Sequence, residues 1–220
     1  MNEKALRIFI GISGMALPPV VAVGAVIAGN CDSVQHSVSL YYNTIMRNVF
    51  IAVLVSNALF LFFYRGYNSH DRIVSAVAGI FVLGIAFFPP TKEVVINCNY
   101  KILGYERPDW VRPAHLVSAG LYFLTLAYVS FFLFTKTDNN LVFTREKQKR
   151  NIIYRISGIV ILISLLLIIA YMLKPDYILK KAEKYHPVFW LESIALWAFG
   201  TSWLIKGGVI LKDKNIDRVF

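Results

Sequence analysis

The sequence predicts an all-α membrane protein: one domain, residues 1–220, folded as a polytopic transmembrane bundle of six helices with both termini in the cytoplasm. Three observations lead to this prediction. Hydrophobic residues make up 57% of the 220 residues and charged residues only 16%, whereas about a quarter of a soluble domain is charged. The apolar residues fall in six long runs. The basic residues lie between these runs, as expected where Lys and Arg mark membrane topology.

Each apolar run approaches the length of about 20 residues that a helix needs to cross the hydrocarbon of a bilayer. The predicted spans are residues 7–29, 46–64, 73–89, 114–134, 152–173 and 187–206. The first run is too long for the apolar core of a cleavable signal peptide, so we expect an uncleaved helix. Pro18 and Pro19 lie at its middle, where two backbone donors are missing, so a kink or a break is expected there.

The other runs differ in their polar content and packing residues. The second holds Arg47 near its start and Asn57 midway. The third is short and rich in small residues, which suggests a place at the centre of the bundle or local bilayer thinning. The fourth opens with His115 and is crowded with aromatic residues. The fifth is the most uniformly apolar and is expected to be the most exposed to lipid.

Orientation follows from the basic residues. The termini and the two loops on their side carry more Lys and Arg than the opposite loops. The positive-inside rule therefore places both termini in the cytoplasm of a multi-pass protein in a plasma membrane, the bacterial inner membrane. Cys31 and Cys98, the only two cysteines, then fall in outer loops. An oxidising outer compartment permits a disulfide between them, with two free thiols as the alternative.

The last span carries a carboxylate, Glu192, and no other predicted span contains an acid. A carboxylate in hydrocarbon is costly unless it is protonated, paired or facing water, so it marks a candidate site. Arg47 lies in the outer half of its own span and is a candidate partner, which would clamp two helices. With Tyr41, Tyr42 and His115 nearby, the guanidinium is also suited to an anionic lipid headgroup.

The same side of the membrane gathers a candidate metal set. His36, His115, His186 and Glu192 provide the imidazole and carboxylate ligands that zinc accepts. No two of them have the spacing of a known metal motif, and polar residues at a wet rim are the alternative. We expect no cofactor, and zinc is the one exception that these residues would admit.

The motifs that the sequence lacks exclude dinucleotide chemistry and ATP hydrolysis. It has no GxSxG elbow, no phosphate-binding GxxxxGK[ST] loop, no HExxH and no CxxC. The net charge of +10 does not predict nucleic-acid binding, because the basic residues flank apolar runs and instead favour contact with anionic lipid. Whether the protein is an enzyme is left undecided.

Four segments carry a resemblance: HSVSLYYNTIMRNVF, FFYRGY, NIIYRISG and FWLESIALWAFGTSWLIKG. They are similar to those of a group of bacterial six-span membrane proteins of about this size, and the chain more loosely resembles the FRAG/DRAM/SFK type of membrane protein. The resemblance implies a six-helix bundle with cytoplasmic termini and a link to lipid handling or membrane organisation. It provides no catalytic residues.

Three function hypotheses remain. The first is a protein that binds a membrane lipid or another amphiphile in an outer-facing polar pocket, built from residues 30–47, residues 90–115 and the start of the Glu192 helix. The second is a zinc hydrolase acting on lipids. The third is a small channel or transporter, in which a broken first helix, Asn57 and Glu192 line a path through a monomer or a homo-oligomer.

Overall fold

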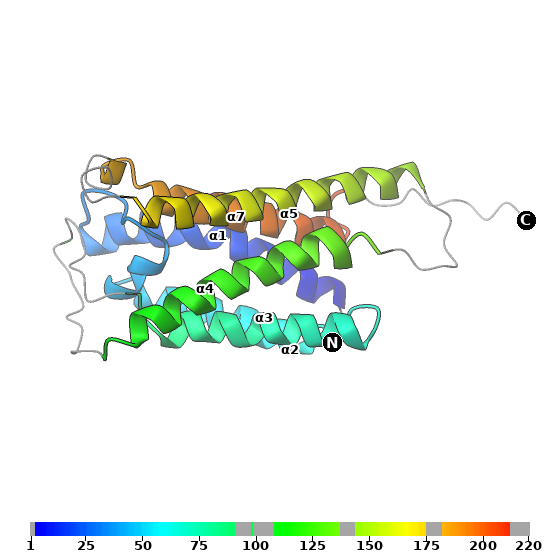
Figure 1. Cartoon of the computed structure of the whole chain (residues 1–220), viewed down its shortest axis with the longest axis horizontal. Coiled ribbons are helices and arrows are strands. Elements are labelled where there is room, and N and C mark those ends of the chain that lie inside the picture. The colour runs from blue at the N-terminus through cyan, green and yellow to red at the C-terminus, as the bar shows by residue number, and fades with distance from the viewer. Residues whose placement is uncertain (1–2, 91–97, 99–107, 137–143, 175–181, 212–220) are drawn as a thin grey trace, which may run out of the picture.

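Six long helices run side by side along one axis in the computed structural model of the chain (Figure 1), which describes residues 3–90, 98, 108–136, 144–174 and 182–211. They are α1 (Glu3–Gly29), α2 (Arg47–Phe63), α3 (Ser69–Phe87), α4 (Val111–Tyr128), α5 (Arg145–Met172) and α7 (Pro187–Lys206). A short 3-10 helix, η1 (Ser39–Asn43), precedes α2, and a π-helical turn, η2 (Val129–Leu133), continues α4.

The predicted all-α class is confirmed for the described residues. Five helices are long and apolar enough to cross a membrane, while α2 is apolar but, at 17 residues, shorter. The last predicted span has the bounds of α7. Four helices, α1, α3, α4 and α5, begin earlier than their apolar runs. Polar caps start two of them: the Asn68 side chain accepts the Asp71 amide before α3, and the Thr144 hydroxyl accepts the Lys147 amide before α5.

Of the two alternatives for the first helix, a kink or a break, the break is wrong, because α1 is continuous through Pro18 and Pro19. Proline at position 19 cannot donate to the carbonyl of Met15, four residues earlier. That carbonyl instead accepts a hydrogen bond of 3.1 Å from the indole Nε1 of Trp197 on α7. A neighbouring helix thus satisfies the group that the proline leaves unpaired, as membrane bundles commonly do.

The helices form a closed ring. Each packs against the next in the order α1, α2, α3, α4, α5 and α7, and α7 packs back against α1. The contact between α1 and α7 is close because glycines meet there: a Cβ added at Gly200 would lie 2.6 Å from the Gly11 carbonyl oxygen. Small residues allow such close approach of helix backbones.

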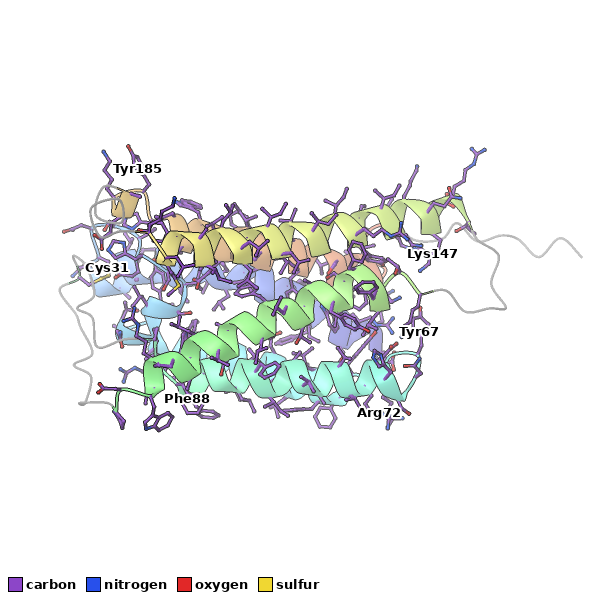
Figure 2. All side chains as sticks on the ribbon, viewed as in Figure 1. Cys31, Tyr67, Arg72, Phe88, Lys147 and Tyr185 are labelled. Atoms are coloured by element: carbon purple, nitrogen blue, oxygen red, sulfur yellow. A yellow bond between two sulfur atoms is a disulfide. The ribbon has the colours of Figure 1, made fainter. Side chains whose placement is uncertain are left out.

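Among the five candidate spans α7 is the most buried, and the third predicted span is not. Half of the apolar window of α7 is buried, against 39% for α3. The small residues of α3 have a local purpose, since Gly79 packs on Phe62 of α2 and Gly84 on Ser118 of α4. The fifth predicted span, in α5, is the least buried of the five candidate spans, and its exposed side chains project along its outer face (Figure 2). Those large exposed side chains include Ile152, Ile156, Ile159, Ile163 and Leu166.

The two ends of the bundle differ in composition. One end, called here the disulfide end, carries Cys31, Phe88 and Tyr185, and the opposite end carries Tyr67, Arg72 and Lys147 (Figure 2). We call the second the terminal end, because α1 begins and α7 ends there. The Arg7 guanidinium donates to the carbonyl of Lys206 across this junction.

Candidate functional site at the disulfide end

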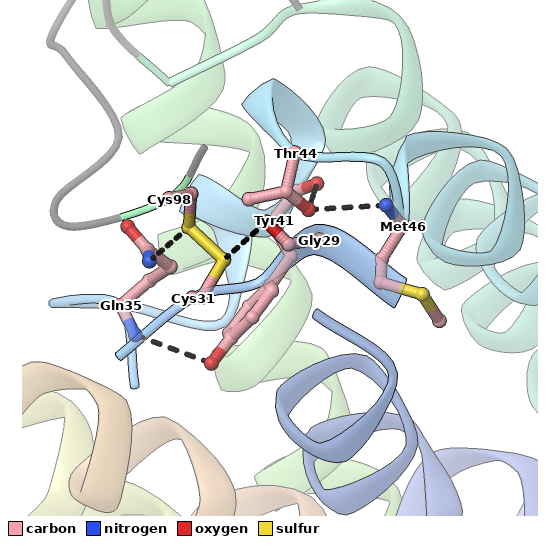
Figure 3. The surroundings of a disulfide bond; sticks show 7 residues. All are labelled: Gly29, Cys31, Gln35, Tyr41, Thr44, Met46 and Cys98. Atoms are coloured by element: carbon pink, nitrogen blue, oxygen red, sulfur yellow. Dashed lines mark hydrogen bonds between the residues drawn. A yellow bond between two sulfur atoms is a disulfide. The ribbon is translucent and has the colours of Figure 1, made fainter. Parts of the chain in front are cut away.

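A disulfide joins Cys31 to Cys98, as one of the two sequence alternatives proposed. Both cysteines are buried, and the Gln35 side-chain amide donates to the Cys98 sulfur at 3.3 Å (Figure 3). The bond fixes the segment after α1 to one point of the long loop between α3 and α4. Residues 91–97 and 99–107 of that loop lie outside the described part of the chain.

The segment from residue 30 to residue 46 is a packed polar layer and not an exposed loop. Gln35, Tyr41 and Thr44 are each 0% exposed. The Tyr41 hydroxyl accepts the Gln35 amide at 3.1 Å, and the Thr44 hydroxyl donates to the Tyr41 carbonyl and accepts the Met46 amide (Figure 3). Burial raises the pKa of Tyr41, and the Gln35 amide lowers it in part. The Tyr41 hydroxyl is therefore held by a backbone group of this layer.

Glu192 fastens this layer to α7. Its carboxylate accepts the Val38 backbone amide at 2.6 Å, with a weaker contribution from Ser39. Both amides lie at the start of η1, where a negative charge is favoured by the exposed N–H groups and the helix dipole. In return, the His36 carbonyl accepts the Phe189 amide in the first turn of α7 at 2.9 Å. The start of α7 and the segment that leads into η1 therefore hydrogen-bond to each other in both directions.

Three side chains form a chain at the rim of this end. His36 Nε2 lies 2.9 Å from a Glu183 carboxylate oxygen, and His36 Nδ1 lies 3.2 Å from His186 Nδ1. A carboxylate only accepts, so His36 carries its proton on Nε2 when neutral and accepts at Nδ1, which makes His186 the donor. Burial first and the neighbouring His36 second lower the pKa of His186, and Glu183 offsets part of that shift.

His115 stands apart from the other two histidines. It is buried between α3 and α4, and its Nδ1 lies 2.6 Å from the Phe88 carbonyl oxygen. Because a carbonyl only accepts, Nδ1 carries the proton. The bond satisfies the carbonyl of the residue that follows α3, so His115 ties the end of one helix to the start of the next.

The predicted zinc ligands are therefore not gathered around one point. His36 and His186 are neighbours, but Glu183 approaches the far nitrogen of His36, while Glu192 and His115 bind backbone groups. No group of three or more histidine, cysteine or acidic residues suited to a metal ion occurs among the described residues.

The predicted pair between Arg47 and Glu192 does not form either. Within the described chain Glu192 binds η1, and Arg47 binds Tyr42: its Nε donates to the Tyr42 carbonyl at 2.8 Å, and its guanidinium lies 4.8 Å from the Tyr42 ring centre. Backbone amides provide the acid with nearer partners than another helix can. The Nη2 atom of Arg47 is buried and has no acceptor among the described residues.

Two residues of this end were missed by sequence reasoning. Glu183 is the partner of His36, and Gln35 contacts the disulfide. A signal existed for Glu183, which stands three residues before His186 in an amphipathic stretch between two spans. Gln35 had none, because a single amide in a polar segment is ordinary.

Comparison of the chain with known protein families, curated proteins and solved structures found no match. The family resemblance stays a prediction. Function is argued below from the contacts at the disulfide end.

Proposed function

We propose that this is a membrane-spanning protein that binds the anionic headgroup of a lipid or a similar amphiphile at the disulfide end, through Arg47. The single observation behind the proposal is the buried Nη2 atom of Arg47, a charged donor without an acceptor among the described residues. Such a group costs free energy until an acceptor reaches it. A phosphate oxygen is the acceptor that a guanidinium suits best.

The surroundings of Arg47 favour an amphiphile over a small soluble anion. The guanidinium is held in place by the Tyr42 ring and carbonyl, while the side chain stays partly exposed and within reach. Met46 provides no side-chain cap to α2, so amides of the first turn add to the positive potential at this point. Ile45 and Val49 are exposed on either side. They offer apolar contact to acyl chains beside the headgroup.

The ligand set is narrower than the one predicted from sequence. Tyr41, His115 and Glu192 are engaged with protein groups. Their part in the proposal is to hold the segment that carries Tyr42, leaving Arg47 and Tyr42 as the ligand contacts.

The orientation that we propose has six spans and cytoplasmic termini, with α2 crossing as the shortest. The basic loops on the side of the termini support it. The disulfide supports it as well, because it then faces an oxidising compartment.

The two alternative functions receive less support. A zinc hydrolase needs converging donors, and those described here diverge. A pore lined by a broken first helix and Asn57 is less supported because α1 is continuous. Asn57 is also buried, accepting from the Ser13 hydroxyl at 2.9 Å.

The test is lipid retention by the protein extracted in mild detergent, measured by native mass spectrometry. Arg47→Gln removes the guanidinium and keeps a polar side chain of similar length. Arg65→Gln, an exposed arginine just beyond the other end of α2, is the matched control. We expect Arg47→Gln to lower the bound fraction of phosphatidylglycerol about tenfold, the loss typical of one charge-assisted hydrogen bond.

Two results would count against the proposal. One is equal lipid retention by the wild type and Arg47→Gln. The other is an equal loss in Arg47→Gln and Arg65→Gln, which would indicate general charge attraction. Because disulfide formation can be read in the same spectra from the mass shift on reduction, an unfolded variant is recognised separately.

A further inference from the structure

The terminal end gathers cations from several helices around one carbonyl group. Lys206, the last residue of α7, donates to the Phe134 carbonyl at 3.2 Å, and Lys147 of α5 donates to the same oxygen at 3.4 Å. Two ammonium groups that share one neutral acceptor lie close together and repel each other. Arg7 of α1 and Arg150 of α5 are near enough to add to the repulsion on Lys206.

Aromatic rings hold these cations in place. The Lys206 ammonium lies 4.6 Å from the centre of the Tyr67 ring and donates to its hydroxyl at 3.0 Å. It also lies over Phe134 and Tyr154. The Arg7 guanidinium lies 5.4 Å from the centre of the Tyr64 ring. Ring faces attract cations but carry no net charge, so they leave the excess of positive charge in place.

Two acids of this end, Asp71 and Glu3, are already engaged, and Glu146 in the first turn of α5 forms no ion pair among the described residues. Asp71 is buried, pairs with Lys136 and accepts the Tyr67 amide at 3.0 Å. Glu3 pairs with Arg7 at 2.7 Å. Lys206 forms no ion pair with any carboxylate of the described residues.

Two donors at this end are buried without a partner among the described residues, as is one acceptor, Asn151 Oδ1 of α5. Trp203 is 0% exposed and its Nε1 has no acceptor among the described residues; the same holds for the buried Nε of Arg7. The two residues share a neighbour, since the Trp203 ring meets the Tyr64 ring at 5.2 Å. An indole N–H and a guanidinium can only donate, so each of these two atoms lacks an acceptor.

We propose that the terminal end contains a phosphate-binding site, formed where the start of α1, the start of α5 and the end of α7 meet, with Lys206 and Arg7 as its principal donors. A phosphate group has several charged oxygens and so accepts from donors on different helices at once. The same chemistry is offered by a phospholipid headgroup and by a soluble phosphate. The site is separate from the one at Arg47, which lies at the opposite end of the bundle.

The experiment is thermal unfolding of the full chain in a neutral detergent, with two probes. One probe is inorganic phosphate, and the other is mixed micelles containing phosphatidylglycerol, compared with phosphatidylcholine alone. A ligand that binds only the folded state raises the unfolding temperature as its concentration exceeds the dissociation constant. Lys206→Met keeps the packing stem without the charge. Lys149→Met, an exposed lysine near the start of α5, makes the same change away from the site.

We expect one probe to stabilise the wild type and the Lys149→Met variant alike, and its apparent affinity to fall about tenfold or more in Lys206→Met. Stabilisation by phosphate identifies a soluble ligand, and stabilisation by phosphatidylglycerol alone identifies a headgroup. Without any anion, Lys206→Met should unfold no earlier than the wild type, because it removes a repelled charge.

Three outcomes overturn the proposal. They are no response to either probe, an equal loss of response in both variants, and an unchanged response in Lys206→Met. If Lys206→Met fails to fold, Arg7→Gln replaces it with the same expected loss of affinity. The Arg47→Gln variant should keep this response, which separates the site from the one at the disulfide end.

Discussion

The two ends of the bundle handle charge in opposite ways. At the disulfide end the charged group nearest the core is an acid, Glu192, and backbone amides of η1 bind it. At the terminal end two cations, Lys206 and Lys147, share the carbonyl of Phe134. At the disulfide end, backbone amides of the protein itself bind the charged group. At the terminal end, Lys206 contacts aromatic ring faces and the carbonyl oxygen that it shares with Lys147.

This difference separates charged groups that stabilise the fold from charged groups that can still bind a ligand. A carboxylate that accepts amides at the start of a short helix is stabilised within the protein and has little left to offer a ligand. Crowded cations and unpartnered donors gain from an added anion. The same reasoning selects Arg47 at the disulfide end. Its guanidinium has one hydrogen-bonded nitrogen and one buried nitrogen without an acceptor among the described residues, whereas the groups around it have hydrogen-bond partners.

The largest effect should come from removing the disulfide. The bond between Cys31 and Cys98 closes a loop with a sequence separation of 67, for which the chain-entropy model gives a stabilisation of about 4 kcal/mol. We expect the double variant Cys31→Ser with Cys98→Ser to unfold at a clearly lower temperature than the wild type. Hydrogen exchange should rise first in residues 30–46, which pack against the bond.

Exchange at the terminal end is the internal control for that variant. The Asp71 amide, which donates to the Asn68 side chain, should keep its protection at temperatures below unfolding. An equal rise in exchange at both ends would show that the ends are not independent, and the comparison between them would fail.

We expect a smaller loss of unfolding free energy when Glu192, the acid that binds η1, is replaced. Glu192→Leu leaves the Val38 amide buried without its acceptor, which costs about 1–3 kcal/mol. Glu192→Gln keeps a carbonyl oxygen in reach of that amide, so it should lose less. Glu183→Gln, which changes an exposed carboxylate at the same end, should lose least. The measurement is the free energy of unfolding of all three variants in one detergent.

The ranking of these variants decides the role of Glu192. If Glu192→Leu were as stable as the wild type, the carboxylate would not be holding the polar layer to α7. Glu192 would then again be a candidate ligand contact.

The helices were predictable because membrane length and apolar content determine them. The last predicted span has the bounds of α7, and the disulfide was one of the two alternatives that the sequence offered for Cys31 and Cys98. The continuity of α1 was not predictable. It depends on the Trp197 indole reaching the Met15 carbonyl, and no periodicity indicates which face of α7 turns toward α1.

The site was only partly predictable for a related reason. Glu192 and Arg47 were singled out by their cost in an apolar run, but their partners lie in backbone groups, which every residue carries and no sequence pattern reveals. The cation cluster was hidden for another reason. Lys206 and Lys147 stand far apart in the chain, where each reads as an ordinary basic flank of a membrane span.

The smallest expected effect concerns the pH dependence of the disulfide end. Burial and the neighbouring His36 hold the pKa of His186 below its ordinary value of 6.5, so the folded protein binds fewer protons there than the unfolded chain. The resulting stability is full above that value and is lost as pH falls toward the lowered pKa. The effect is modest because His186 is partly exposed and solvent screens its charge. His186→Gln should flatten the fall in unfolding temperature between about pH 8 and about pH 5. An identical slope in the wild type and His186→Gln would show that acid weakens the disulfide end through another group.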